Sequence, residues 1–128
     1  MPRFTVERLQ PREDMRGTVL EPLGPSALAA QKNVHVVVSS PGAVRGNHHH
    51  ERGTEIMTVY GPAHVRLRDG DETTDVRAAS GEVLRITIPP GVGHAVRNVG
   101  DGPMLIVSFS TEPHDHDHPD VVRDMLLA

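Results

Sequence analysis

Glycine and proline interrupt this chain so frequently that only short segments of regular structure fit between them. The sequence contains 12 Gly and 11 Pro among 128 residues. The clearest segment is Ala63–Arg68, in which apolar residues occupy every second position, as on a strand with one buried face. Similar segments are Val34–Val38, Thr54–Tyr60, Glu72–Arg77, Val83–Ile88, His94–Val99 and Met104–Ser110. Short strands with turn signals about every ten residues predict an all-β sandwich or barrel.

Turn and helix signals complete the expected architecture. Asp69-Gly70 predicts a tight hairpin between two of the strands. Ser26–Gln31 could form one short helical turn, and Pro119 suits the first position of a short C-terminal α-helix. Its apolar stripe would consist of Val121, Val122, Met125 and Leu126. Because the chain has no internal repeat and no linker, we expect one domain over residues 1–128.

Composition excludes several classes of protein. Without cysteine, the chain cannot form a disulfide scaffold, a thiolate zinc site or a cysteine nucleophile. The 13 Lys and Arg against 17 Asp and Glu give a net charge of −4, and no basic cluster favours nucleic acid. No apolar run approaches the roughly 18 residues of a membrane span. The N-terminus lacks a signal-peptide pattern, so we expect a cytoplasmic protein without nucleic-acid or membrane partners.

Histidine is the chemically informative residue, with 9 copies. His48 and His50 lie two positions apart, so on a strand both imidazoles face the same side, and His49 faces the other. Glu55 shares a face with apolar neighbours, where a carboxylate is costly unless it is paired or bound to a cation. His94 opens a later strand. Three imidazoles and one carboxylate suit a divalent Zn, Fe, Mn, Ni or Cu ion, with binding expected to weaken below about pH 6.

These residues stand in a spacing that resembles the cupin superfamily. Gly42, His48, His50, Glu55 and Gly61 resemble the first cupin motif, and the second is similar to the stretch with Pro89, Gly91, His94 and Asn98. Two spacings depart from the family pattern. Five residues instead of six separate Glu55 from Gly61, and Val83 stands where the second motif usually has glycine. The resemblance implies a double-stranded β-helix, or jelly-roll barrel, that is commonly dimeric. It also implies a metal inside the barrel on His48, His50, Glu55 and His94.

A finer resemblance concerns the segment Arg45-Gly46-Asn47-His48. It is similar to the Arg-Gly-x-His segment of sugar-nucleotide cupins, including dTDP-4-dehydrorhamnose 3,5-epimerases and 3,4-ketoisomerases. In those enzymes the histidine is a catalytic base, and a metal is not generally required. Residues 33–120 also resemble the cupin domain that ends capsular-polysaccharide biosynthesis proteins. The resemblance implies epimerase- or isomerase-type proton transfer next to a ketone of a nucleotide deoxy-sugar, in polysaccharide or glycoside biosynthesis. His48 could be the base only if the site is metal-free.

Other polar residues have both a functional and a structural interpretation. Arg45 could grip a diphosphate or be a surface charge. Asn98 could contact substrate or close a strand end, and Tyr60 could be a general acid, although its alternation places it opposite Glu55. We expect His49 either to face solvent or to support the ligands from behind, without binding the metal itself. We expect His64 to face solvent, and His35 could face either way. The tract His114–His118 could bind a second metal, although a solvated loop is the expectation.

Two alternatives to the enzyme hypothesis stay open. The first is a non-catalytic cupin module that binds a small acid or sugar, and the second is a metal cupin dioxygenase or isomerase acting on another small molecule. Only three aromatic residues, Phe4, Tyr60 and Phe109, are available to stack on a nucleoside, which argues against a nucleotide sugar. We expect a homodimer that exchanges N-terminal strands or docks the Val121–Leu126 helix, because a small barrel has edge strands to cover.

Overall fold

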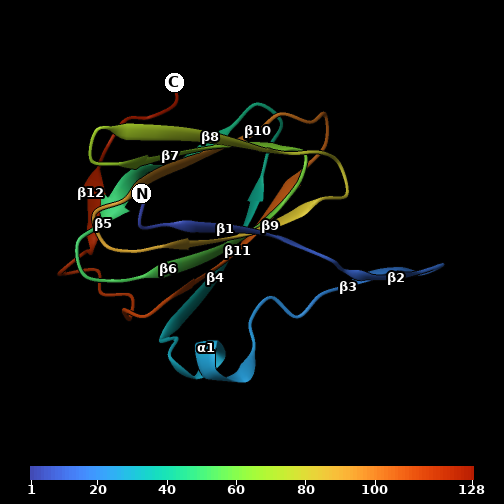
Figure 1. Ribbon diagram of the computed structural model, residues 1–128, viewed down its shortest axis with the longest axis horizontal. Helices are drawn as coiled ribbons and strands as arrows, with labels where there is room; N and C mark the ends of the chain where they lie inside the picture. The colour runs from blue at the N-terminus through green and yellow to red at the C-terminus, as the bar shows by residue number, and fades with distance from the viewer.

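A computed structural model describes residues 1–128 and consists of two five-stranded antiparallel sheets packed face to face (Figure 1). The first sheet has the order β1 (Thr5–Leu9), β9 (Val83–Ile88), β6 (Glu55–Tyr60), β11 (Met104–Ser110), β4 (Asn33–Ser39). The second has the order β12 (Val121–Arg123), β5 (Val44–His50), β10 (Gly93–Asn98), β7 (Ala63–Asp69), β8 (Glu72–Ala78). This arrangement confirms the expected all-β jelly-roll barrel, and the strands predicted between residues 34 and 110 are present.

The remaining elements lie outside the two sheets. A hairpin of β2 (Arg12–Asp14) and β3 (Gly17–Val19) projects away from the barrel, and the short α1 (Pro25–Ala29) precedes β4 (Figure 1). The helix coincides with the turn expected near Ser26–Gln31. It is too short to cross a membrane, and the protein has no other helix.

The core forms between the inner faces of the two sheets because apolar residues alternate along the strands. Leu84 and Ile86 of β9 lie opposite Val65 and Leu67 of β7, and all four are fully buried. Each buried aliphatic side chain of this size contributes about 1.5–3 kcal/mol relative to an exposed one. The hairpin between β7 and β8 turns at Gly70, whose φ of 61° is the left-handed conformation that a tight turn demands. The turn predicted at Asp69-Gly70 is therefore confirmed.

The predicted C-terminal helix is wrong. Val121–Arg123 is instead the edge strand β12, which pairs antiparallel with His48–His50 of β5. The rest of the chain continues without helical structure across the outer face of the second sheet. Two neighbouring β-branched valines favour a strand, and the free edge of β5 supplies backbone partners that a helix of this length would lack.

Candidate metal centre

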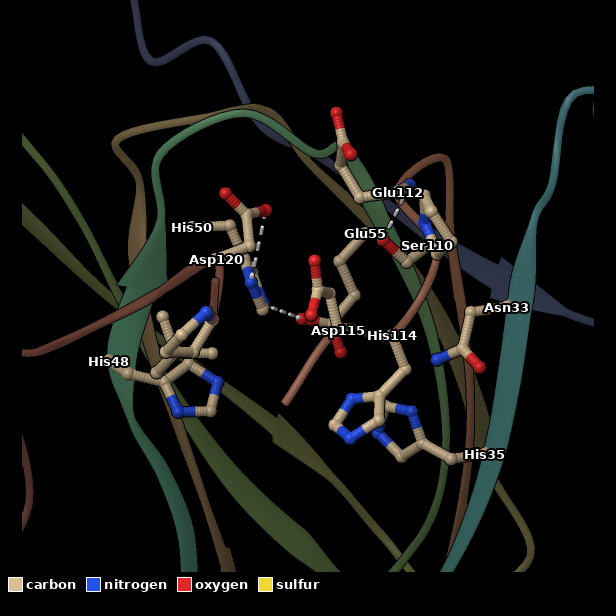
Figure 2. A pocket seen from close by; sticks show the side chains of 13 residues that line it. Asn33, His35, His48, His50, Glu55, Ser110, Glu112, His114, Asp115 and Asp120 are labelled. Atoms are coloured by element: carbon tan, nitrogen blue, oxygen red, sulfur yellow. Dashed lines mark hydrogen bonds and ion pairs between the residues drawn. The ribbon is translucent and has the colours of Figure 1, made fainter. Parts of the chain in front are cut away.

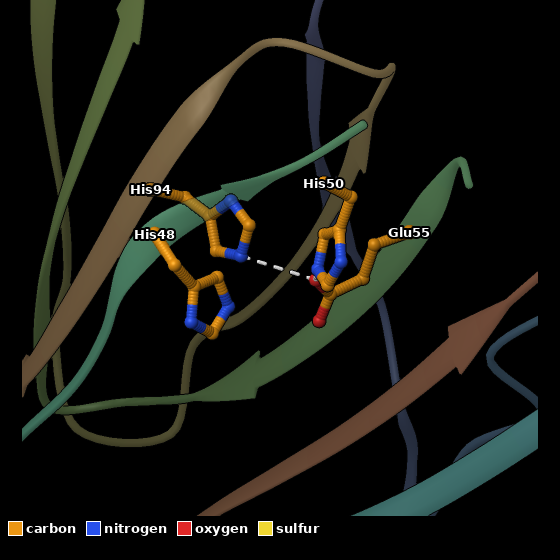
Figure 3. Close-up of side chains that lie close together, drawn as sticks. All are labelled: His48, His50, Glu55 and His94. Atoms are coloured by element: carbon orange, nitrogen blue, oxygen red, sulfur yellow. Dashed lines mark hydrogen bonds and ion pairs between the residues drawn. The ribbon is translucent and has the colours of Figure 1, made fainter. Parts of the chain in front are cut away.

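Four titratable side chains predicted as metal ligands meet at one end of the barrel. His48 and His50 come from β5, His94 from β10 and Glu55 from β6, so the cluster draws on both sheets (Figure 3). One potential ligand atom from each residue lies within 4.8 Å of those of the others. His48 and His94 are direct partners in the β5–β10 pairing, which aligns their rings on the inner face. The turn at Pro89–Val92 also binds β5, since the Gly91 N–H donates to the His50 carbonyl over 2.8 Å.

The orientation of His94 fits a metal ligand. Its Nδ1 lies 3.3 Å from the Val92 carbonyl, so a proton on Nδ1 would leave Nε2 with a free lone pair. Nε2 is buried without a hydrogen bond, and Glu55 Oε1 lies 3.1 Å away. His50 Nε2 lies 2.7 Å from the same oxygen. Because these donors converge in a buried place, the three imidazoles and one carboxylate fit a first-row divalent cation.

Ser108 of β11 holds the other oxygen of Glu55. Its hydroxyl donates to Oε2 in a short contact, and both residues are buried. Burial alone would raise the pKa of Glu55, but the adjacent imidazoles of His50 and His94 outweigh burial and hold that pKa well below its ordinary value. Glu55 is therefore ionised at neutral pH, with Oε1 directed at the imidazoles.

The pKa values of His48 and His50 are shifted in opposite directions. Burial, assisted by the charges of His94 and His50, lowers the pKa of His48 to about 4. Burial also disfavours the charged form of His50, but the hydrogen bond with Glu55 and the charges of Glu55 and Asp120 raise its pKa overall. At neutral pH His48 is therefore an uncharged imidazole that can bind a cation or accept a proton.

A bulge in β5 places Arg45 on the same face as the histidines. The register of β5 against β10 shifts between Gly46 and His48, which leaves Asn47 as the extra residue with a φ of 57°. Arg45 pairs with Val96 and His48 with His94, so both side chains face the barrel interior, and both line a small pocket beside the cluster. Without this bulge, strict alternation would place Arg45 and His48 on opposite faces.

An open pocket of about 180 Å³ leads from solvent to the cluster (Figure 2). His48 of β5 and His35 of β4 face it from opposite sides. His35 points inward because it pairs with Ser108, whose hydroxyl reaches Glu55. Ten of the 13 residues that line the pocket have polar or charged side chains, and the other three are Pro113, Pro119 and Val121. The ten are Asn33, His35, His48, His50, Glu55, Ser110, Glu112, His114, Asp115 and Asp120.

The tract His114–His118 is the exposed loop that was expected from the sequence. His114 and Asp115 line the mouth of the pocket, and the rings of His114 and His116 contact each other. Neither these residues nor His118 belong to a cluster with metal-ligand spacing. The tract therefore borders the site without forming a second one.

The structure does not bring Asn98 or Tyr60 to the cluster. The Asn98 amide donates to the carbonyls of Ser39 and Gly102, and its oxygen accepts from the Gly100 N–H, so its hydrogen-bonding groups close a strand end. Tyr60 lies at the opposite end of β6 from Glu55, where partial burial raises its pKa.

The expectation that His64 faces solvent is wrong. His64 is only 6% exposed, and its Nε2 lies 2.6 Å from Asp75 Oδ1. It is on the outer face of β7, but Arg66 and Arg97 beside it bind carbonyls of Leu126 and Ala128. The C-terminal segment therefore covers this face, which local alternation cannot reveal. His49 also faces outward but is half-buried, with Nδ1 3.6 Å from Asp124.

Sequence reasoning missed two residues that contact the cluster. Ser108 is a small polar residue that shares the buried face of β11 with Met104 and Ile106, a signal that could have marked it. Asp120 lies in the pocket wall beside His50, and only the C-terminal strand pairing brings it there.

Comparisons with known proteins agree with this fold. The sequence matches the family described as polysaccharide biosynthesis C-terminal domain over residues 12–122. It is 31% identical over 93 residues to the spore coat polysaccharide biosynthesis protein SpsL of Bacillus subtilis (strain 168), covering 66% of this chain and 62% of SpsL.

Two solved structures share the architecture. The capsular polysaccharide assembling protein CapF of Staphylococcus aureus has a TM-score of 0.68 and 28% identity, over 75% of this chain and 27% of CapF. The sugar 3,4-ketoisomerase QdtA of Thermoanaerobacterium thermosaccharolyticum, solved in complex with TDP, has a TM-score of 0.68 and 18% identity, over 94% of this chain and 88% of QdtA. This chain thus spans less than two thirds of SpsL and about a quarter of CapF.

The family match extends from the β2–β3 hairpin to β12 and includes all four clustered side chains. The chain belongs to the polysaccharide biosynthesis C-terminal domain family.

Proposed function

We propose that this chain is a metal-binding epimerase or isomerase domain that acts on a nucleotide-linked deoxy-sugar by moving a proton next to a ketone. The observation that carries the proposal is the convergence of His48, His50, Glu55 and His94 in a solvent-accessible pocket, with Arg45 on the same face. The names of SpsL and CapF support polysaccharide biosynthesis as the setting, and QdtA supports a TDP-linked sugar as the kind of substrate.

A divalent transition metal held by His48, His50, Glu55 and His94 would supply Lewis-acid polarisation of the substrate ketone. The ion could be Zn, Fe, Mn, Ni or Cu, since all of them accept imidazole and carboxylate ligands. Ser108 fixes Oε2 of Glu55, so Oε1 is the carboxylate oxygen that faces the imidazoles.

The chain must also supply a base that takes the proton from the carbon next to the ketone. The C–H electron pair moves toward the carbonyl as the proton leaves, and in an epimerisation the proton returns to the other face of the same carbon. In an isomerisation that carbon carries a hydroxyl, whose proton moves to the former carbonyl oxygen while the carbon-bound proton is returned to the former carbonyl carbon, so the ketone shifts by one carbon. If the site works without metal, His48 is the base, because its low pKa keeps the imidazole neutral. If His48 holds the metal, the base is His35, an imidazole that lines the pocket from β4 and is not one of the four metal ligands.

Arg45 is the proposed anchor for the diphosphate. Its side chain faces the same pocket as His48 and His94, and a guanidinium can bind two phosphate oxygens at once. Arg45→Ala should therefore raise the KM for a nucleotide sugar more than it lowers kcat, and Arg45→Lys should restore part of the loss.

Exchange of substrate protons in D₂O tests the proposal directly. The protein is incubated with a dTDP- or UDP-linked 4-keto-deoxyhexose, and proton NMR follows deuterium entry next to the ketone. We expect entry with the unmodified chain, loss with His48→Gln, and retention with the matched control His49→Gln, which changes the outward side of the same strand. Loss with His35→Gln as well would assign the base to His35 in the metal-bound form.

Three results would overturn the proposal of a nucleotide-sugar epimerase or isomerase. Binding of the nucleotide sugar, seen as a thermal shift without deuterium entry, would identify a binding module. A failure of both dTDP- and UDP-sugars to shift the melting temperature would exclude the nucleotide sugar. Oxygen uptake by the iron-loaded protein would favour a dioxygenase instead.

A homodimer is part of the proposal. The outer face of the edge strand β4 exposes Val34, Val36 and Val38 by 56%, 62% and 62%, next to Leu105 of β11. An apolar edge strand in solvent is a site for pairing with another chain. Light scattering should give twice the 13.9 kDa chain mass, and a monomer at micromolar concentration would contradict the proposal.

A further inference from the structure

Asp120, which directly precedes strand β12, makes three hydrogen bonds with the backbone beside the cluster. Its Oδ1 accepts the Arg52 N–H over 2.8 Å, and its Oδ2 accepts the Gly53 N–H over 2.9 Å. Its backbone carbonyl accepts the Glu51 N–H over 3.1 Å. One residue thus binds three successive amides of the turn that connects His50 to Glu55.

The same carboxylate faces the ring of His50. Asp120 Oδ2 lies 3.8 Å from His50 Nδ1, and His50 Nε2 lies 2.7 Å from Glu55 Oε1 (Figure 2). Asp120 therefore stands behind His50 as the Val92 carbonyl stands behind His94. At 3.8 Å this is a contact through charge and not a hydrogen bond, and the negative charge beside Nδ1 favours a proton on that nitrogen, which leaves the Nε2 lone pair for the site.

Gly53 makes this approach possible. A Cβ at position 53 would lie 3.0 Å from Asp120 Oδ2 and 3.1 Å from the Ser110 hydroxyl. A side chain at this position would press against the carboxylate, so glycine accommodates the close approach of Asp120 to the turn. The Asp120 side chain is 12% exposed, so its hydrogen bonds operate largely away from water.

We propose that Asp120 is a positioning residue, which fixes the turn between His50 and Glu55 and orients the His50 ring toward the metal. The inference rests on the proposed metal binding, and it assigns a task to a residue that directly precedes β12 and lies outside both cupin motifs. Removing such a partner behind a ligating histidine typically costs 10–100-fold in metal affinity.

Titration with Co²⁺ tests the inference, because its visible absorption reports which ligands surround the ion. A competing chelator suppresses weak binding to the exposed histidines of residues 114–118. We expect Asp120→Ala to weaken Co²⁺ binding 10–100-fold and to change the absorption bands. The matched control is Asp117→Asn, which removes a charge from the same loop outside the pocket lining, and it should change neither.

Asp120→Asn keeps the shape of the side chain and decides the matter if the alanine variant does not fold. It is expected to weaken Co²⁺ binding to a smaller degree, because one oxygen can still accept an amide. If a folded Asp120 variant bound Co²⁺ with unchanged affinity and unchanged absorption bands, the positioning role of Asp120 would be overturned, but the proposed metal binding would not. Absence of Co²⁺ binding by the unmodified chain would instead overturn the proposed metal function, and the inference with it.

Discussion

Gly46 is the position at which a single methyl group should disturb both the fold and the site. Its φ of 92° lies in a region that residues with a side chain rarely adopt, at a cost of about 1–3 kcal/mol. A Cβ there would also lie 2.7 Å from the His94 carbonyl oxygen and 3.2 Å from the Ala95 Cα. These atoms cannot move aside, because β10 is paired with both β5 and β7.

We therefore expect Gly46→Ala to lower the free energy of unfolding by about 2–4 kcal/mol, the sum of backbone strain and a contact that no rotamer relieves. For a chain of this length each kcal/mol corresponds to about 4 °C, so the melting temperature should fall by about 8–16 °C. Because the bulge aligns Arg45 and His48, the affinity for Co²⁺ should fall as well.

Stability is measured by urea and thermal unfolding of chelator-treated protein. The affinity for Co²⁺ is measured by titration of a separate, folded sample. Gly102→Ala is the matched control, because a Cβ at Gly102 would meet nothing within 4 Å and its φ is outside the left-handed region. Its stability should stay within about 0.5 kcal/mol of the unmodified chain. If Gly46→Ala were equally stable and bound Co²⁺ normally, the argument from the bulge would be refuted.

Three further predictions concern the site and the surface. The pKa of His50 is raised above 6.5, so Co²⁺ must displace the proton of His50 in order to bind. Titrations from about pH 8 to 5.5 should therefore show up to tenfold weaker Co²⁺ binding per pH unit below that pKa. In the metal-free chain, the stability that the protonated His50–Glu55 pair contributes is present below pH 6.5 and is lost as pH rises through the raised pKa. Ser108→Ala should destabilise the chain by about 1–3 kcal/mol in urea unfolding, because it removes a buried hydrogen-bond donor from Glu55. Thr58→Val should be neutral or stabilising, because the buried Thr58 hydroxyl has no hydrogen-bond partner. The opposite order of stabilities would contradict this hydrogen-bond assignment. Val36→Glu should convert the proposed dimer to a monomer in light scattering, and an unchanged mass would place the interface elsewhere.

Local patterns were sufficient for the strands between residues 34 and 110 and for the clustered side chains, but not for β1, β2, β3 or β12. Alternation places His48 with His50, and Glu55 with buried Met57, because each pair lies within one strand. The spacing around His94 identified the fourth member, and the pairing of β5 with β10 places it beside His48. These relations depend on a few neighbouring residues, so they can be read along the chain.

The errors and omissions arise where distant segments meet. The free edge of β5 and the Asn47 side chain, which accepts the backbone N–H groups of Leu126 and Leu127, hold the C-terminal residues extended. That same segment buries His64. The bulge at Asn47 depends on the pairing of β5 with β10, so alternation alone would place Arg45 on the face opposite His48. The contact of Asp120 with the turn at Gly53 joins residues 67 positions apart.

The division of the cluster between the two sheets has a mechanical consequence. Three of the four side chains belong to one sheet and Glu55 belongs to the other. An ion bound to all four side chains would link the two sheets to each other at this end of the barrel. The ends of the two sheets could then separate only when the ion is released. Amide hydrogen exchange in β5 and β6 would then slow together as the ion is added, while exchange in the projecting β2–β3 hairpin would continue at its own rate.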